Sequence, residues 1–277
     1  MTTAPGSASA LARNAANNGS DVVFACGGDG TVHEVVQGLV SEGGRPAAAL
    51  GIVPVGSANA LARHLRLPLD PVNAALAQVR GSERTIPVGK LECDGLTRYF
   101  TVMAGAGPDG ALVYKMLTAQ KSSAGRFAYY RRAAELFATR RFSAFEIEFV
   151  RSEANGFESV RAVSAMAVRV SDLGGLFRGL AGRMGSIEDD ELRLLLVRPP
   201  AILALPLWFV SSWLGLRRFN PLLKAVSVSE FRCIPADGAA MHVEADGEWI
   251  GRGPVVVSIL PGALRIRMPE GAAKYEA

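Results

Sequence analysis

A glycine-rich turn that carries one acidic residue stands between two apolar segments near the start of the chain. It reads Cys26-Gly27-Gly28-Asp29-Gly30-Thr31, and it follows the apolar run Val22–Ala25. The apolar spacing after the turn predicts a helix over 32–40, and the run before it predicts a buried strand. Glycines let the backbone approach a ligand, and the free N–H groups at a helix start attract anions. The turn therefore predicts a phosphate site. Asp29 suggests an added hydrogen bond to a nucleotide hydroxyl or to a metal-bound water.

Two residues just after the turn have simpler interpretations. Thr31 and Glu34 have the spacing of a capping box, in which two side chains satisfy the first N–H groups of a helix. Capping is therefore the role we expect for Glu34. His33 is expected to be an exposed helix residue rather than a general base. Neither interpretation explains three glycines and an aspartate in one turn, so the phosphate site stays the leading prediction.

A second polar loop follows the next apolar run, at 48–55. It reads Gly56-Ser57-Ala58-Asn59 and leads into a helical segment that begins at Ala60. Ser57 alone could be a simple N-cap. However, the carboxyl ends of neighbouring parallel strands meet at one edge of a sheet, so the two loops would form the two walls of one crevice.

The pattern of the chain changes after about residue 85. Before that point strands and helices alternate, which predicts an α/β domain with a parallel sheet over 1–88. Beyond it, strand-like runs are separated by turn signals such as Asp94-Gly95 and Asp246-Gly247, with one helix near 125–141. This second part, 89–277, is predicted to be a β-rich sandwich or barrel. We expect its C-terminal tail to return to the first domain.

Composition and charge narrow the class of protein. The chain has 277 residues, of which 49% are hydrophobic and 20% charged, as in a folded protein with a large core. Three widely spaced cysteines do not form a disulfide framework, and the N-terminus lacks the pattern of a secretory signal, so a cytoplasmic setting is predicted. A net charge of +4 does not indicate nucleic-acid binding. The uncharged run at 199–216 approaches a spanning length, but Pro206 interrupts it. This favours a partly buried amphipathic helix, or a surface that touches a membrane, over a crossing.

The segments GGDGTVHEVVQGL and PVGSANALARHL together resemble the diacylglycerol kinase catalytic-domain family, which includes bacterial lipid kinases and sphingosine kinases. The similarity extends over nearly the whole chain, through Ala104–Asp109, Gly125–Tyr129, Val243–Glu248 and Ile259–Leu264. It implies a nucleotide-binding α/β domain followed by a β-rich lipid domain. Because the family begins with a further strand, an Asn-Pro glycine loop and a helix, it also implies that this chain is N-terminally truncated.

The resemblance assigns roles to individual residues. The residues implied to bind ATP are Thr2, Gly27, Gly28, Asp29, Gly30, Thr31, Val32, His33, Gly56, Ser57 and Asn59. Of these, Gly27 to His33 and Ser57 would line the phosphates. Glu248 would take the proton from the acceptor hydroxyl, with Asp246 as its close partner. Without the resemblance, Asp246-Gly247 would be interpreted as a hairpin turn.

The resemblance also implies two uses of magnesium. One Mg²⁺ accompanies ATP. A structural magnesium site is implied at Ser186, Asp189 and Glu191, where Asp189 would supply its side chain and the other two their carbonyl groups. Asp190 and Arg193 depart from the family's pattern at this loop, and an arginine nearby opposes a cation.

These features predict an ATP-dependent kinase that phosphorylates a primary hydroxyl of a diacylglycerol- or sphingoid-type lipid. It would work at the inner face of the membrane through transient surface contact, without nucleic acid, and a homodimer is left open. Two alternatives are a kinase of soluble acceptors similar to NAD kinase, and a non-catalytic protein that binds nucleotide or lipid.

Overall fold

The computed structural model describes residue 4 and residues 6–118, 135, 142–151, 156–170, 186–199, 222–236 and 239–269. The helices are α1 (Ser7–Asn17), α2 (Asp29–Leu39), α3 (Ala60–His64), α4 (Pro71–Arg80) and α5 (Pro108–Thr118). The strands are β1 (Val22–Gly27), β2 (Ala49–Pro54), β3 (Ser82–Cys93), β4 (Leu96–Phe100), β5 (Met103–Ala106), β6 (Phe145–Arg151), β7 (Phe157–Ala162), β8 (Ser164–Val168), β9 (Leu192–Val197), β10 (Leu223–Ile234), β11 (His242–Ala245), β12 (Glu248–Arg252) and β13 (Val255–Met268).

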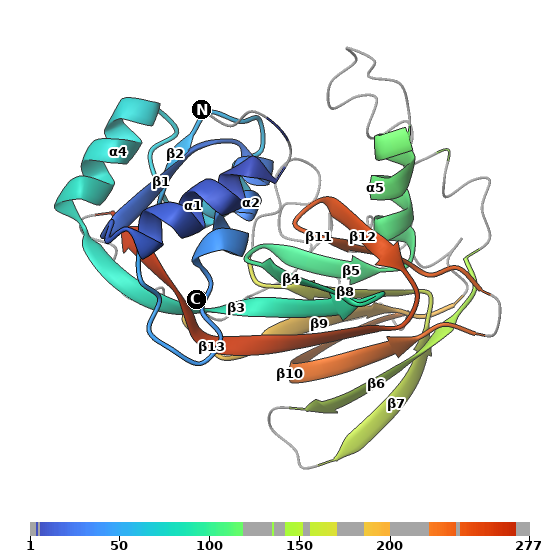
Figure 1. Ribbon diagram of the computed structural model, residues 1–277. Coiled ribbons are helices and arrows are strands. Elements are labelled where there is room, and N and C mark those ends of the chain that lie inside the picture. The colour runs from blue at the N-terminus through green and yellow to red at the C-terminus, as the bar shows by residue number, and fades with distance from the viewer. Residues whose placement is uncertain are drawn as a thin grey trace.

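The described strands form one hydrogen-bonded network. Its main path runs β1-β2-β13-β10-β9-β8-β5-β11-β12, with β3 on β13, β4 on β3, β6 on β10 and β7 on β6. The pairs β1–β2 and β2–β13 are parallel, and the other pairs are antiparallel. Helices α1, α2 and α4 gather around the parallel end, and α5 stands against β11 and β12 (Figure 1). The predicted combination of a parallel α/β part and a β-rich part is confirmed.

The first helices pack as their apolar spacing predicts, but α2 begins earlier than expected. Its buried stripe is Val32, Val35, Val36 and Leu39. The helix starts at Asp29 with Gly28 as its N-cap, so Thr31 lies inside the first turn and the predicted capping box is wrong. Glu34 instead accepts a hydrogen bond from the N–H of Ala8 at 3.1 Å. It therefore caps the neighbouring helix α1 rather than its own.

Other elements differ from the predicted runs. Two of the strand-like runs predicted beyond residue 85 are at 98–104 and 160–170, and each divides into two strands, β4 with β5 and β7 with β8. The first division arises because the N–H groups of Thr101, Val102 and Met103 donate to Asp246 instead of to a neighbouring strand. Helix α4 was not predicted, although Asp70 caps it and Pro71 occupies its first position.

Two predicted segments of the second part of the chain cannot be compared with the structure. The helix expected near 125–141, apart from residue 135, and the apolar run beyond Pro199 lie outside the described residues. Within the described ranges, none of the helices combines the length and the hydropathy that a membrane crossing needs.

The apolar interior consists of two main clusters that share their longest strands. One cluster contains the packed faces of α1, α2, β1 and β2, together with Ile86 and Val88 of β3. The other fills the β-rich part and includes Leu91 and Cys93 of the same strand. Strand β13 likewise contributes to both clusters. The division of the chain after residue 88 thus falls inside β3, and it stays a prediction.

Candidate active site

The two glycine loops predicted to face each other pack backbone against backbone. A Cβ atom on Gly56 would lie 2.4 Å from the Cα of Gly28, and one on Gly28 would lie 3.2 Å from the Cα of Gly56. The N–H of Val55 also donates to the carbonyl of Gly27 at 3.1 Å. Glycine at 28 and 56 is therefore needed for the contact between the loops themselves.

Asp29 joins these loops. Its carboxylate accepts hydrogen bonds from the N–H of Asn59 at 2.8 Å and from the N–H of Ala60 at 2.6 Å, which caps α3. The amide of Asn59, whose backbone is left-handed with φ 50°, bonds both the N–H and the carbonyl of Gly56. The open question about the acid in the turn thus has a structural answer, because both of its oxygens hold the second loop in place.

The start of α2 suits a phosphate group. Helical N–H groups in the first turn have no partner within the helix, and the helix dipole is positive there. Gly30 is exposed, with open space where a side chain would stand, and Ser57 is exposed on the facing loop. Val32 lies behind the loop, with its side chain in the core and its N–H bonded to Gly28. Thr2 lies outside the described residues. The residue assignments to ATP stay predictions.

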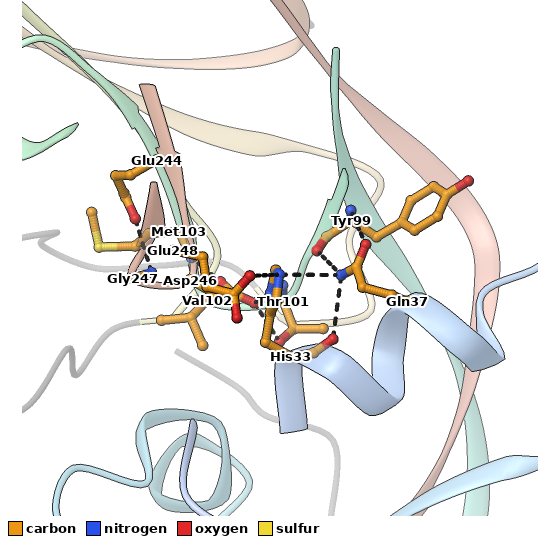
Figure 2. A network of polar contacts seen from close by, with 10 residues as sticks. All are labelled: His33, Gln37, Tyr99, Thr101, Val102, Met103, Glu244, Asp246, Gly247 and Glu248. Carbon is orange, nitrogen blue, oxygen red and sulfur yellow. Dashed lines mark hydrogen bonds and ion pairs between the residues drawn. The ribbon is translucent and has the colours of Figure 1, made fainter. Parts of the chain in front are cut away.

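His33 is buried between α2 and the turn that joins β11 to β12, so the expectation of an exposed residue is wrong. Only 1% of its side chain is exposed, because this turn covers that face of α2. Nδ1 lies 3.4 Å from Oδ2 of Asp246, and Nε2 lies 3.5 Å from Oε2 of Glu248 (Figure 2). Burial lowers the pKa of His33, but the hydrogen bond and charge of Asp246 and the charge of Glu248 together raise it above 6.5.

Asp246 is a fixed acceptor. Its carboxylate accepts from the N–H groups of Thr101, Val102 and Met103 at 2.9, 2.9 and 3.0 Å. Its side chain is 4% exposed, and its own backbone is left-handed with φ 48°. This carboxylate is held by donors on one side and by His33 on the other, so it serves as an anchor.

Glu248, at the start of β12, differs in access. Its side chain is 43% exposed, and the contact that the structure gives its carboxylate is the ion pair with His33. A carboxylate that reaches solvent can meet a substrate hydroxyl, whereas that of Asp246 is enclosed. The two acids predicted as a catalytic pair both contact His33, and Glu248 is the one that reaches solvent. Their catalytic roles stay predictions.

A second pair of acids lies beneath the same turn and was missed as a pair. Glu244 is 1% exposed and accepts from the N–H of Gly247 at 2.9 Å. In the pairing of β11 with β5, Glu244 lies opposite Gly105. A Cβ atom on Gly105 would lie 1.3 Å from Oδ2 of Asp109, so the carboxyl of Asp109 occupies the space that this glycine leaves. Burial raises the pKa of Asp109 to about 7, and burial and the charge of Asp109 raise that of Glu244. The spacing of Gly105 and Asp109 was the available signal.

The side chain of Arg169 supplies a positive charge at the loop 186–191, where a structural magnesium ion was predicted. The buried guanidinium of Arg169 donates to the carbonyl oxygens of Ile187, Glu191 and Pro87 at 2.7, 3.2 and 3.1 Å.

The nearby carboxylate is also engaged. Oδ2 of Asp189 accepts from the N–H of Ser186 at 2.7 Å. Burial lowers the pKa of Arg169 to about 10, so it stays charged at neutral pH. A fixed positive charge that holds the carbonyl of Glu191 repels a divalent ion, and these residues do not fit a metal.

Comparison with known proteins shows similarity to one family of kinases. Residues 1–91 match the model of the diacylglycerol kinase catalytic domain. A diacylglycerol kinase of Bacillus subtilis (strain 168) is 36% identical over 149 residues, which are 53% of this chain and 47% of that protein. A diacylglycerol kinase of Staphylococcus aureus (strain JH9) is 27% identical over 254 residues, covering 90% and 75%. The match thus spans about half the length of the first relative and three quarters of the second.

Solved structures share the fold. The crystal structure of a diacylglycerol kinase from Bacillus anthracis str. Sterne superposes with a TM-score of 0.72 at 22% identity, covering 98% of this chain and 85% of that one. A second crystal structure from the same strain gives 0.75 at 21% identity, covering 98% and 84%. With the family match over the two glycine loops, these findings confirm the resemblance predicted from the motifs. Residues 1–91 thus match the diacylglycerol kinase catalytic-domain family, and the relatives that align over longer stretches are diacylglycerol kinases.

Proposed function

We propose that the chain is an ATP-dependent lipid kinase that transfers the γ-phosphate to a primary hydroxyl of a diacylglycerol- or sphingoid-type lipid. The contact of His33 with Glu248 carries the proposal. His33 lies in the helix whose N-terminus suits a phosphate, and Glu248 is the exposed acid of the β11–β12 turn. The contact therefore sets a phosphate-binding element beside a carboxylate that can act as a base. Phosphoryl transfer mainly needs this kind of positioning.

The reaction uses few groups of the chain. The first turn of α2 and the loop 56–59 hold the phosphates of ATP. The Mg²⁺ that accompanies the nucleotide neutralises charge on the transferred group. The oxygen of the lipid hydroxyl attacks the γ-phosphorus, its proton passes to Glu248, and the bond from this phosphorus to the bridging oxygen breaks. The products are a phosphorylated lipid and ADP.

A cavity with both polar and apolar groups in its walls lies near the hairpin that carries the proposed base. It has a volume of about 110 Å³ and lies between α5, residues 142–145 and residues 235–236 and 239–242. Ala111, Phe145 and Met241 are among its walls, and His242 connects it to the hairpin that carries Glu248. The apolar part of these walls could contact hydrocarbon of a lipid acceptor. We further propose that the protein contacts the inner face of the membrane transiently and does not bind nucleic acid. A homodimer is the oligomeric state to examine.

A radiolabel assay tests the proposed function. The protein is incubated with γ-³²P-labelled ATP, Mg²⁺ and mixed micelles that contain diacylglycerol or sphingosine, and in parallel with NAD. We expect labelled lipid from the wild type and a loss of at least about 100-fold in Glu248→Gln, because a general base is removed. Glu230→Gln, which removes an exposed charge on β10, is the matched control and should keep full activity.

Three outcomes separate the alternatives. Labelled NAD without labelled lipid would select the soluble-acceptor kinase. ATP binding without any product would select the non-catalytic protein. Equal activity in the wild type and in Glu248→Gln would remove Glu248 from the mechanism.

A further inference from the structure

His33 lies between two carboxylates that differ in mobility and access. Asp246 is held by three N–H groups of the 101–103 segment, and its Oδ2 receives Nδ1 of the imidazole. Because an ionised aspartate accepts and never donates, Nδ1 carries a proton. The ring is thereby oriented with Nε2 toward Glu248 (Figure 2).

Gln37 gives Nε2 of His33 a second partner. The amide of Gln37 donates through Nε2 to the carbonyl of Tyr99 at 2.7 Å and accepts through Oε1 from the N–H of Tyr99 at 3.0 Å. These two bonds define the orientation of the amide. Its NH₂ group therefore lies 3.4 Å from Nε2 of His33.

The two partners of Nε2 suit different protonation states. A neutral ring accepts at Nε2 from the amide of Gln37. A protonated ring repels that NH₂ group and donates to the carboxylate of Glu248 instead. Both states of the imidazole therefore have a partner in place.

We propose that His33 is a positioning residue that orients Glu248 and accepts the proton that Glu248 takes from the lipid hydroxyl. This inference rests on the proposed function. The proton moves from the carboxyl of Glu248 to Nε2 of the neutral ring, which regenerates the carboxylate and leaves an imidazolium. Its two N–H groups then face Asp246 and Glu248. After ADP and the phosphorylated lipid leave, the imidazolium releases the proton to water, so that each turnover frees one proton.

The charges around the ring support this storage of a proton. Burial disfavours the imidazolium, and so does the positive charge of Arg98 on β4. Asp246 and Glu248 of the β11–β12 turn outweigh both, and the pKa of His33 is raised. Below that pKa the ring already carries its second proton and cannot accept another. We therefore expect kcat to fall as the pH falls through the pKa of His33.

The test compares His33→Asn with the wild type across pH. The amide NH₂ of asparagine can replace Nδ1–H toward Asp246, but the variant has nothing in the place of Nε2. We expect kcat to fall about tenfold at neutral pH with KM for ATP and for lipid within about twofold, and the acid limb that His33 causes to disappear. His64→Asn, a histidine of α3 outside this network, is the matched control and should keep both kcat and the limb.

A measurement without turnover accompanies the kinetics. Histidine ring signals are titrated by NMR in the wild type and in Glu248→Gln. The chain has three histidines, and substitutions of His64 and of His242 identify their signals, which leaves the signal of His33. We expect a pKa above 6.5 that falls when Glu248 is neutralised. Should His33→Asn fail to fold, this titration decides, because Glu248 is exposed and its variant should fold.

The outcomes are distinct. An active wild type with an unchanged acid limb in folded His33→Asn overturns the role of His33 and leaves the kinase proposal standing. A pKa of His33 that is the same in the wild type and in Glu248→Gln also overturns this role of His33. A wild type that phosphorylates no lipid overturns the proposed function and the proton transfer with it.

Discussion

Two pairs of acids lie at the β11–β12 turn, and their electrical surroundings are opposite. On the side of α2, Asp246 is surrounded by N–H groups and the imidazole of His33. On the side of α5, Glu244 and the carboxyl oxygens of Asp109 are buried, and one oxygen of Glu244 accepts from the N–H of Gly247. Both oxygens of Asp109 are buried with no hydrogen-bond partner recorded in the described part of the chain.

The difference shows what each side does. A carboxylate with several donors keeps its charge when it is buried, whereas burial next to another acid favours the neutral form. Donors on one side keep a charge beside the proposed catalytic base. On the other side, the raised pKa values of Asp109 and Glu244 indicate neutral acids that support the turn from beneath. Substitutions that remove charge but keep shape should therefore act oppositely on the two pairs.

The largest expected effect is at Asp246. In Asp246→Asn an NH₂ group would face backbone donors, and His33 would lose its anion. We expect the free energy of unfolding to fall by about 3 kcal/mol, because buried N–H groups lose the charged acceptor to which they donate. Urea denaturation at pH 7.5 measures the change. Glu248→Gln, two residues further along the chain and exposed, should cost less than about 0.5 kcal/mol. Equal costs at the two positions would contradict the anchoring role of Asp246.

Arg169 extends the comparison to a buried cation. Carbonyl groups surround its guanidinium as N–H groups surround Asp246. In Arg169→Met the carbonyls of Pro87, Ile187 and Glu191 would lose their donor, and we expect a loss of about 2 kcal/mol.

Metal removal is the complementary measurement at this loop. Because the guanidinium supplies the positive charge, excess EDTA should change the wild-type melting temperature by less than about 1 °C. A larger loss of stability with EDTA, restored by Mg²⁺, would show that the loop 186–191 binds the ion after all.

Asp109 gives the comparison a pH dependence. Its carboxyl would ionise near pH 3.8 when unfolded, whereas in the folded protein burial raises its pKa to about 7. Between these values the unfolded chain alone releases the proton, so the free energy of unfolding falls as the pH rises from 4 to 7. Asp109→Asn removes this pH dependence. Its free energy of unfolding, relative to that of the wild type, should therefore rise by about 3 kcal/mol between pH 5 and pH 8. Urea denaturation of both proteins at pH 5 and at pH 8 measures this change. The same difference between variant and wild type at both pH values would contradict a neutral Asp109.

The site was predictable where local pattern governs it. The glycines at 28 and 56 and the Asp246-Gly247 turn belong to short motifs, and the strands around them follow from apolar runs. The motif does not say what each residue contacts. Asp29 caps α3 across 31 residues, and Glu34 caps a helix that precedes it in the chain.

Contacts between distant segments explain most of what was missed. His33 is buried by a turn that lies 213 residues further along the chain. The spacing of apolar residues within α2 therefore could not predict that this side chain is buried. Arg169 closes a strand-like run, and its three carbonyl partners come from β3 and from the loop 186–191. Helix α4 is different, because Asp70-Pro71 was a local signal that the prediction passed over.

The smallest effect is expected at Glu244, and it sharpens the contrast with Asp246 most directly. In Glu244→Gln the side-chain oxygen still accepts from the N–H of Gly247, and the change matches a carboxyl that is already neutral. The free energy of unfolding at pH 6 should therefore change by less than about 0.5 kcal/mol, against the loss of about 3 kcal/mol for the same type of substitution at Asp246. Urea curves of the two variants at one pH make the comparison. A loss at Glu244 as large as that at Asp246 would mean that Glu244 is ionised, and that a cation outside the described contacts compensates it.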